Sequence, residues 1–271
     1  MSDLLFMLSL APVAKGLVAM TIAGLCFPAA GVMVLRLDLV PMRYMLMHGV
    51  ILGGALSLAF SLPLLPVSIA LNLLLVLGML KLTKDSSAGF GVSSAAAMVF
   101  TMALASIVMH VFDVPAKDTL QLLWGSPFAL RVSDVLGLLA IALALTLYVV
   151  FNFKSISAIF FDQEIAQSLG MRVQAHHTAM VIVIALVIAL AMKLLGALLI
   201  DALLILPVLI AARHAQSLKQ LFIRACLVGV FVSFFGFIAA VATDLPPSGT
   251  IALLSAFLYL IITTIVQRKK S

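Results

Sequence analysis

A series of apolar segments, most of them close to 20 residues long, recurs along the whole chain and constrains the fold more than any other feature. About 20 apolar residues are needed for a helix to cross the hydrocarbon core of a bilayer. Only structures that satisfy their own backbone hydrogen bonds are stable there. The sequence therefore predicts an all-α, polytopic transmembrane bundle of eight or nine segments, with bounds at 13–35, 41–62, 64–82, 92–112, 132–153, 177–197, 198–212, 220–241 and 249–267.

The composition supports this class. Hydrophobic residues make up 65% of the 271 positions and charged residues only 10%, whereas soluble domains average about 45–50% and about 25%. Since no polar stretch is long enough to fold separately, residues 1–271 are expected to form a single transmembrane domain. The start of the chain lacks the basic residues and cleavage site of a signal peptide, so residues 1–12 are expected to belong to the mature protein. They are also expected to lie at the membrane interface.

One predicted segment differs from the others. Residues 198–212 are too few to span straight, and they follow the preceding segment at Gly196 with almost no loop. A broken or re-entrant helix packed inside protein meets both conditions.

The basic residues predict the orientation, because cytoplasmic loops carry an excess of Lys and Arg. An outside N-terminus leaves four of them elsewhere, at Lys15, Lys117, Arg131 and Lys193. It places twelve on the cytoplasmic side: Arg36, Arg43, Lys81, Lys84, Lys154, Arg172, Arg213, Lys219, Arg224, Arg268, Lys269 and Lys270. The net charge of +6 is thus a property of membrane topology, and we expect no nucleic-acid partner. The predicted location is a cytoplasmic membrane, with the C-terminus inside.

Several catalytic motifs are missing from the sequence. There is no G-x-x-x-x-G-K-[ST] phosphate loop, no H-E-x-x-H and no G-x-S-x-G, so ATP binding by that loop and two common kinds of hydrolase are excluded. We expect no enzyme activity in this chain, and any use of ATP requires a partner.

Two stretches together resemble the permease subunits of metal-importing ABC transporters of the zinc, manganese and iron type. The first, "FFDQEIAQSLG", matches the family pattern F-D-x-E-x-A-x-x-x-G at Phe161, Asp162, Glu164, Ala166 and Gly170. The second, "GALLIDALLILP" (196–207), matches G-x-L-L-x-x-A-L-L-I-x-P, and "LLWGSPFALRVSDVL" (122–136) is similar to an outer-loop pattern of the family.

The resemblance implies a fold related to that of vitamin B12 and siderophore permeases. It also implies a homodimer, two cytoplasmic ATPase subunits that bind ATP, an external solute-binding protein, and a divalent metal as cargo with no permanently bound cofactor. The coupling segment that contacts the ATPase would contain Ala211, Arg213, His214, Ser217 and Leu218, and we expect it to be a short polar helix. An ordinary basic loop is the alternative.

The metal path is expected on the second segment, where the family has Asp-x-x-x-His. A carboxylate and an imidazole at that spacing share one helix face and suit a divalent transition metal. Here "YMLMHGVILGGA" (44–55) has His48 but carries Tyr44 in place of the aspartate, and a neutral phenol is a poor ligand. The alternative for His48 is a neutral histidine that shares a hydrogen bond with a neighbouring helix.

Asp201 is a carboxylate in the middle of the apolar run 194–207. A charged side chain at that depth tends to face protein or a watery path. We hypothesise that Asp201 and His48 face one translocation path, with Asp201 supplying the charge that position 44 lacks. Alternatively, Asp201 bonds to backbone groups freed at Gly196 or pairs with Lys193.

Three further features are open to two interpretations each. An outer vestibule that gathers cations would contain His110, Asp113, Asp118 and Asp244, unless these residues cap helices or contact the binding protein. Met42, Met45 and Met47 could serve Cu(I), although methionine is common in packed cores. Gly49, Gly53, Gly54 and Ala55 form a small-residue face for a dimer contact or an internal one.

The leading interpretation is therefore a permease subunit of an ATP-driven metal importer. A permease for chelated iron, haem or cobalamin is the nearest alternative. An autonomous proton- or sodium-coupled transporter is a second, although such folds have two broken helices in related halves and this sequence shows one.

Overall fold

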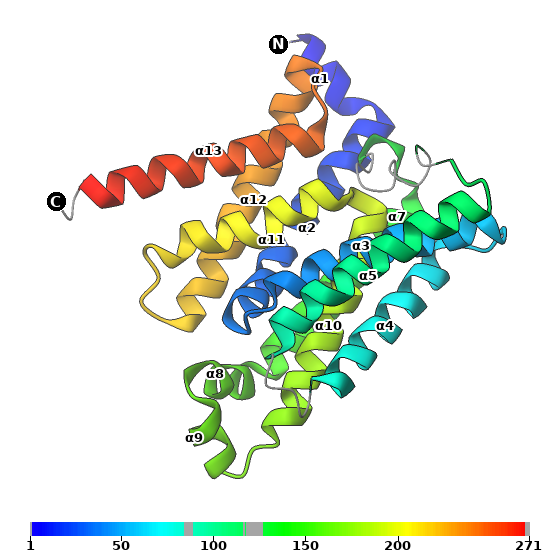
Figure 1. Ribbon diagram of the computed structural model, residues 1–271. Helices are drawn as coiled ribbons and strands as arrows, with labels where there is room; N and C mark the ends of the chain where they lie inside the picture. Colours follow the sequence, from blue (N-terminus) through cyan, green and yellow to red (C-terminus); the bar gives the residue numbers. More distant parts are fainter. Residues whose placement is uncertain (1, 84–88, 116, 118–126, 269–271) are drawn as a thin grey trace. The chain divides into compact units, whose positions relative to one another are not determined.

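The computed structural model of the protein describes residues 2–83, 89–115, 117 and 127–268. All regular structure in these residues is helical (Figure 1). The helices are α1 (Ser2–Ser9), α2 (Ala11–Arg36), α3 (Val40–Ala59), α4 (Leu64–Leu82), α5 (Gly89–Val111), η1 (Pro127–Ala129), α7 (Val132–Phe151), α8 (Phe153–Phe161), α9 (Gln163–Ser168), α10 (Val173–Leu195), α11 (Ala197–Ala212), α12 (Leu218–Thr243) and α13 (Pro247–Arg268).

The predicted membrane segments are confirmed. Eight helices in the described part of the chain are long and apolar enough to cross a membrane, and α11 is a shorter apolar helix of 16 residues. The sequence boundaries hold to within a few residues. The helix α1 coincides with the segment expected at the interface, and its exposed side chains include Phe6 and Met7; its contact with the membrane surface stays a prediction.

The contacts within the chain divide it into two compact units. The first unit holds α1, most of α2, α7, η1, α11, α12 and α13, and the second holds α3, α4, α5, α8, α9 and most of α10. Each unit is built from segments that are far apart in the sequence. Whether the chain behaves as one domain stays a prediction.

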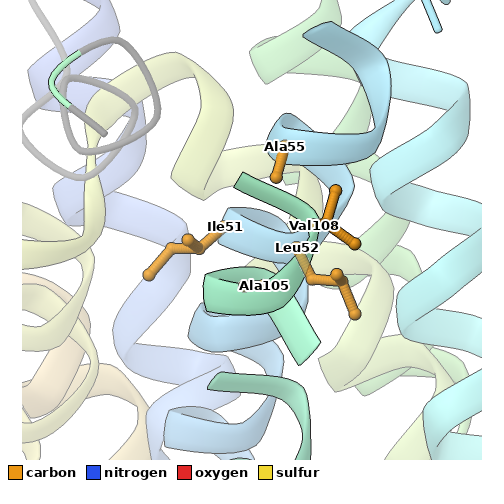
Figure 2. Close-up of a cluster of buried hydrophobic side chains, with 5 residues drawn as sticks. All are labelled: Ile51, Leu52, Ala55, Ala105 and Val108. Atoms are coloured by element: carbon orange, nitrogen blue, oxygen red, sulfur yellow. The ribbon is translucent and has the colours of Figure 1, made fainter. Parts of the chain in front are cut away.

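In the second unit, α3 packs against both α4 and α5 (Figure 1). The core between α3 and α5 consists of Ile51, Leu52 and Ala55 on α3 with Ala105 and Val108 on α5 (Figure 2). All five side chains are apolar and at least nine-tenths buried. This contact fixes α3 along its length, which matters because α3 carries His48.

The glycine face of α3 makes an internal contact with α4. A Cβ atom on Gly53 would lie 2.7 Å from Ser68 Oγ and 2.9 Å from Ser68 Cα, and one on Gly49 would overlap the Asn72 carboxamide. Small residues allow transmembrane helices to approach this closely. Gly49 and Gly53 therefore make a contact within the chain, which is the internal alternative for the small-residue face, and not a dimer contact.

In the first unit, α2 crosses α12 and α11 at glycines. Gly24 of α2 and Gly229 of α12 face each other so closely that a Cβ on either would overlap the other's carbonyl oxygen. Gly31 of α2 lies in the same way against the backbone carbonyl of Leu204 in α11. Such approaches are typical of helix pairs joined by Cα–H···O contacts, each worth perhaps 0.5–1 kcal/mol.

The break before α11 is confirmed. Gly196 has φ +86° and separates α10 from α11, in a backbone region that a side chain makes unfavourable. The amide of Ile200 then donates to the Gly196 carbonyl at 3.3 Å and begins the new helix.

The stretch that matches F-D-x-E-x-A-x-x-x-G folds as α8 and α9, and its residues have local structural roles. Asp162 caps α9 by accepting from the backbone amides of Glu164 (2.8 Å) and Ile165 (3.0 Å). Ala166 is buried, and Gly170, at φ +80°, ends the helix. The amides of Gly170 and Met171 donate back to Gln167 and Ala166, which is a Schellman ending.

Candidate functional site

His48 lies two turns into α3, and its ring is held by a hydrogen bond within the helix. Its Nδ1 is 2.8 Å from the backbone carbonyl oxygen of Tyr44, one turn earlier. Because a carbonyl oxygen only accepts, Nδ1 must carry the proton, which leaves the lone pair of a neutral ring on Nε2. Metal-binding histidines are commonly oriented by such a backbone bond. The His48 ring is half-buried. The bond at Nδ1 therefore leaves Nε2 as the nitrogen that can bind a metal.

Tyr44 occupies the position where the resemblance implies an aspartate. Its side chain is 40% exposed, and its ring centroid lies 4.4 Å from the guanidinium carbon of Arg43. A cation–π contact of this kind is worth about 2 kcal/mol when the cation is desolvated, and Arg43 is only 5% exposed. The ring of Tyr44 is therefore engaged with Arg43.

Arg43 is one of the twelve basic residues counted on the cytoplasmic side, and that placement stays a prediction. The structure shows it in the first turn of α3, where it is buried. Its position within the predicted segment 41–62 was the signal available in the sequence. The sequence did not identify Arg43 as part of the candidate site. The count of Lys and Arg residues used for the orientation does not distinguish a buried basic residue from an exposed one.

Asp201 lies on α11, in the second turn after the break. Its side chain is half-buried and makes at least one interaction within the protein. A carboxylate held by protein in this way avoids the cost of contact with hydrocarbon. Asp201 belongs to the first unit and His48 to the second, so their predicted use of one path stays a prediction.

The predicted coupling segment is a turn rather than a helix of its own. The helix α11 ends at Ala212, α12 begins at Leu218, and the residues between them form turns and bends. Two local hydrogen bonds shape this turn: Ser217 Oγ accepts from the Gln220 amide at 3.2 Å and caps the start of α12, and the Arg224 guanidinium donates to the His214 carbonyl.

The coupling residues differ in exposure. Ala211 is buried at the end of α11 and Leu218 is half-buried, while Arg213, His214 and Ser217 are exposed. The turn thus presents a basic, polar surface that is tied to α12 by Arg224. It joins two helices of one unit directly, so a force on the turn acts on both.

Three of the four residues of the predicted outer vestibule lie in the described part of the chain. His110 and Asp113 are exposed at and just after the end of α5, and exposed Asp244 ends α12 in the left-handed region at φ +54°. Asp118 lies outside the described residues, as do residues 122–126 of the outer-loop pattern. His110 and Asp113 belong to the second unit and Asp244 to the first, so the vestibule stays a prediction.

No cluster of three or more His, Cys, Asp or Glu side chains that could hold a metal occurs in the described part of the chain. Met42 and Met45 are fully buried packing residues, and Met47 is half-buried. What the described residues offer on α3 is one oriented imidazole, which suits brief contact with a passing ion better than storage.

Known proteins resemble this chain over nearly its whole length. A model of the ABC 3 transport family matches residues 10–266. The manganese import system permease protein ScaB of Streptococcus gordonii is 25% identical over 262 residues, which cover 94% of this chain and 92% of the relative. The zinc uptake membrane protein ZnuB of Haemophilus influenzae is 25% identical over 220 residues, which cover 80% and 83%.

Two solved structures share the fold. The structure of PsaBC from Streptococcus pneumoniae in complex with Fab contains a chain that superposes with a TM-score of 0.82 at 23% identity, covering 96% of this chain and 94% of that one. An inward-facing structure of the metal-chelate type of ABC transporter superposes with a TM-score of 0.77 at 16% identity, covering 93% and 85%. The expected bundle architecture is thereby confirmed.

Proposed function

Because this chain belongs to the ABC 3 transport family, we propose that it is the membrane-spanning permease subunit of an ATP-driven importer for a divalent transition metal. The observation that carries the choice of cargo is the His48 ring, whose Nδ1 is bonded to the Tyr44 carbonyl at 2.8 Å and whose Nε2 can coordinate a metal. The manganese and zinc permeases among its relatives support a free ion.

The proposed path has few ligands. A cargo must be released after it binds, so one nitrogen ligand is an advantage for passage and a disadvantage for storage. With Tyr44 engaged by Arg43, the carboxylate of Asp201 is the candidate for the negative charge of the path. His110, Asp113, Asp118 and Asp244 are proposed to attract cations to its outer mouth by their combined field.

The proposed assembly contains two copies of this chain, two cytoplasmic ATPase subunits and an extracytoplasmic solute-binding protein. Arg213, His214 and Ser217 at the exposed turn, with Ala211 and Leu218 at its ends, are proposed to contact the ATPase. Since the turn is short and bonded to α12 through Arg224, movement of the ATPase would be transmitted to α11 and α12 together. The N-terminus is proposed to lie outside and the C-terminus in the cytoplasm.

A permease for a metal chelate is the second candidate. The likeness to the metal-chelate type of transporter favours it at the level of the fold. Supplying free manganese, free zinc and chelated iron to the same preparation would distinguish the two cargoes.

The function is tested by reconstituting the chain in vesicles alone and with its ATPase subunit and binding protein. We expect uphill uptake of radioactive manganese or zinc only when the ATPase and ATP are present, because the chain has no phosphate loop. A variant ATPase that binds but does not hydrolyse ATP is the control. Concentration of ions by the isolated chain under a proton or sodium gradient would overturn the proposal.

A second experiment concerns the charge of Asp201. Asp201→Asn keeps the size of the side chain and one accepting oxygen but removes its charge. If the carboxylate lines the path, the uptake rate should fall by about tenfold, the effect of about 1.4 kcal/mol on a barrier, while assembly is unchanged. If Asp201 only bonds to the backbone near Gly196, the amide will replace it and uptake will match the wild type.

A further inference from the structure

An apolar groove runs along the second unit between α4 and α5. Its volume is about 560 Å³, within the range of about 300–1,000 Å³ that is usual for ligand sites. Its walls include Leu74 and Phe100, which are 68% and 63% exposed, and its lining is almost entirely apolar. The groove is therefore large enough for a hydrophobic ligand and offers it few hydrogen bonds.

Gly78 lines the groove without a side chain. A Cβ atom built on Gly78 would meet no other atom within 4 Å, so no neighbouring backbone requires a glycine at this position. The neighbours along the groove, Leu75 and Leu82, are large apolar residues. A larger side chain at 78 would enter open space in the groove, which makes this position suitable for blocking it.

A basic residue that does not itself line the groove lies on α4 next to the last residue that does. Lys81 is exposed in the last turn of α4, three residues after Gly78 and one before Leu82, and both of these line the groove. Residues three apart share a helix face, and the lysine stem can lie along apolar surface while its ammonium group reaches the interface. Since α4 spans the membrane, this end lies at a membrane surface whichever way the chain is inserted.

An apolar groove with a cation near its end is complementary to an anionic phospholipid, which has apolar acyl chains and a negative headgroup. We propose that the α4–α5 groove binds one phospholipid, with an acyl chain over Gly78 and the headgroup phosphate paired with Lys81. Anionic headgroups attract basic residues near a membrane surface. The charge of Lys81 favours a phospholipid over a second protein chain as the occupant. A second chain could pack against the apolar walls without using this charge.

The proposal is tested by native mass spectrometry of the purified full chain, titrated with phosphatidylglycerol or phosphatidylcholine. We expect one tightly retained phosphatidylglycerol for each chain and weaker retention of phosphatidylcholine. Gly78→Leu should lower the retention of both lipids by about tenfold, the effect of about 1.4 kcal/mol. Lys81→Gln should lower the retention of phosphatidylglycerol more than that of phosphatidylcholine, because the choline cation already offsets the phosphate charge, and should thereby remove the preference for the anionic lipid.

Matched controls are available in the same chain. Gly137 of α7 also has nothing within 4 Å of a built Cβ, and Lys154 of α8 is exposed; neither lines the groove, so Gly137→Leu and Lys154→Gln should retain lipid like the wild type. Equal retention of the two lipids by the wild type, or unchanged retention in Gly78→Leu, would overturn the proposal. Loss of dimers in Gly78→Leu with unchanged lipid would assign the groove to a second copy instead.

A second measurement needs no blocking variant. A ligand that binds only the folded state raises the unfolding temperature, so phosphatidylglycerol should stabilise the wild type more than phosphatidylcholine does. This difference should disappear in Lys81→Gln and persist in Lys154→Gln. A difference that persists equally in both variants would place the lipid elsewhere.

Discussion

Gly31→Ala is expected to destabilise the protein by at least about 3 kcal/mol, at the upper end of the range for overpacking. The added methyl group would overlap the backbone carbonyl of Leu204 in α11, and a carbonyl within a helix cannot turn aside as a side chain can. Both helices would have to separate, which would loosen α2 from the helix that carries Asp201. The unfolding temperature in detergent should fall by about 6 °C or more.

The control for Gly31→Ala is Gly137→Ala. Gly137 lies within a helix as Gly31 does, but a Cβ there meets nothing within 4 Å. Without a clash, replacing glycine by alanine stabilises by about 0.4–1 kcal/mol through the unfolded state. Equal unfolding temperatures for the two variants would contradict the close crossing of α2 and α11.

His48→Ala is expected to lower metal uptake by the reconstituted importer at least about tenfold, since changes even to the groups that orient a metal ligand cost about 10- to 100-fold. The ring nitrogen Nε2 is the group that can bind the cargo, and its loss should leave the fold intact because His48 is only half-buried. Uptake should be measured per assembled complex, with ATP hydrolysis followed in parallel.

His48→Asn separates a metal ligand from a structural histidine. The asparagine Nδ2 stands where the histidine Nδ1 does and can still donate to the Tyr44 carbonyl, but the side chain offers no ring nitrogen. Wild-type uptake in His48→Asn would show that the hydrogen bond alone matters and would reject the ligand role. The matched control is His176→Ala, in the first turn of α10, which should transport normally.

The local features of the candidate site were accessible from the sequence to different degrees. The Gly196 break followed from segment length and a missing loop, and the structure shows it at φ +86°. The coupling segment was expected to be helical, because nothing in its composition revealed that Ser217 would begin α12 and that Arg224 would bond back to His214. The contact of Arg43 with Tyr44 depends on a rotamer, which sequence patterns do not report.

The sequence by itself determined the membrane spans and the break at Gly196, because the cost of exposing backbone and charge to hydrocarbon acts on each segment separately. The family followed from the resemblance of two short motifs. Only the tertiary structure decided that Gly49 and Gly53 face α4, that Gly31 faces Leu204, and that Arg43 is buried with its guanidinium over the Tyr44 ring. The physical reason is that lipid tails and apolar side chains are equally hydrophobic, so hydropathy does not select which helix faces meet. That choice depends on close packing and on single polar contacts between residues far apart in the chain.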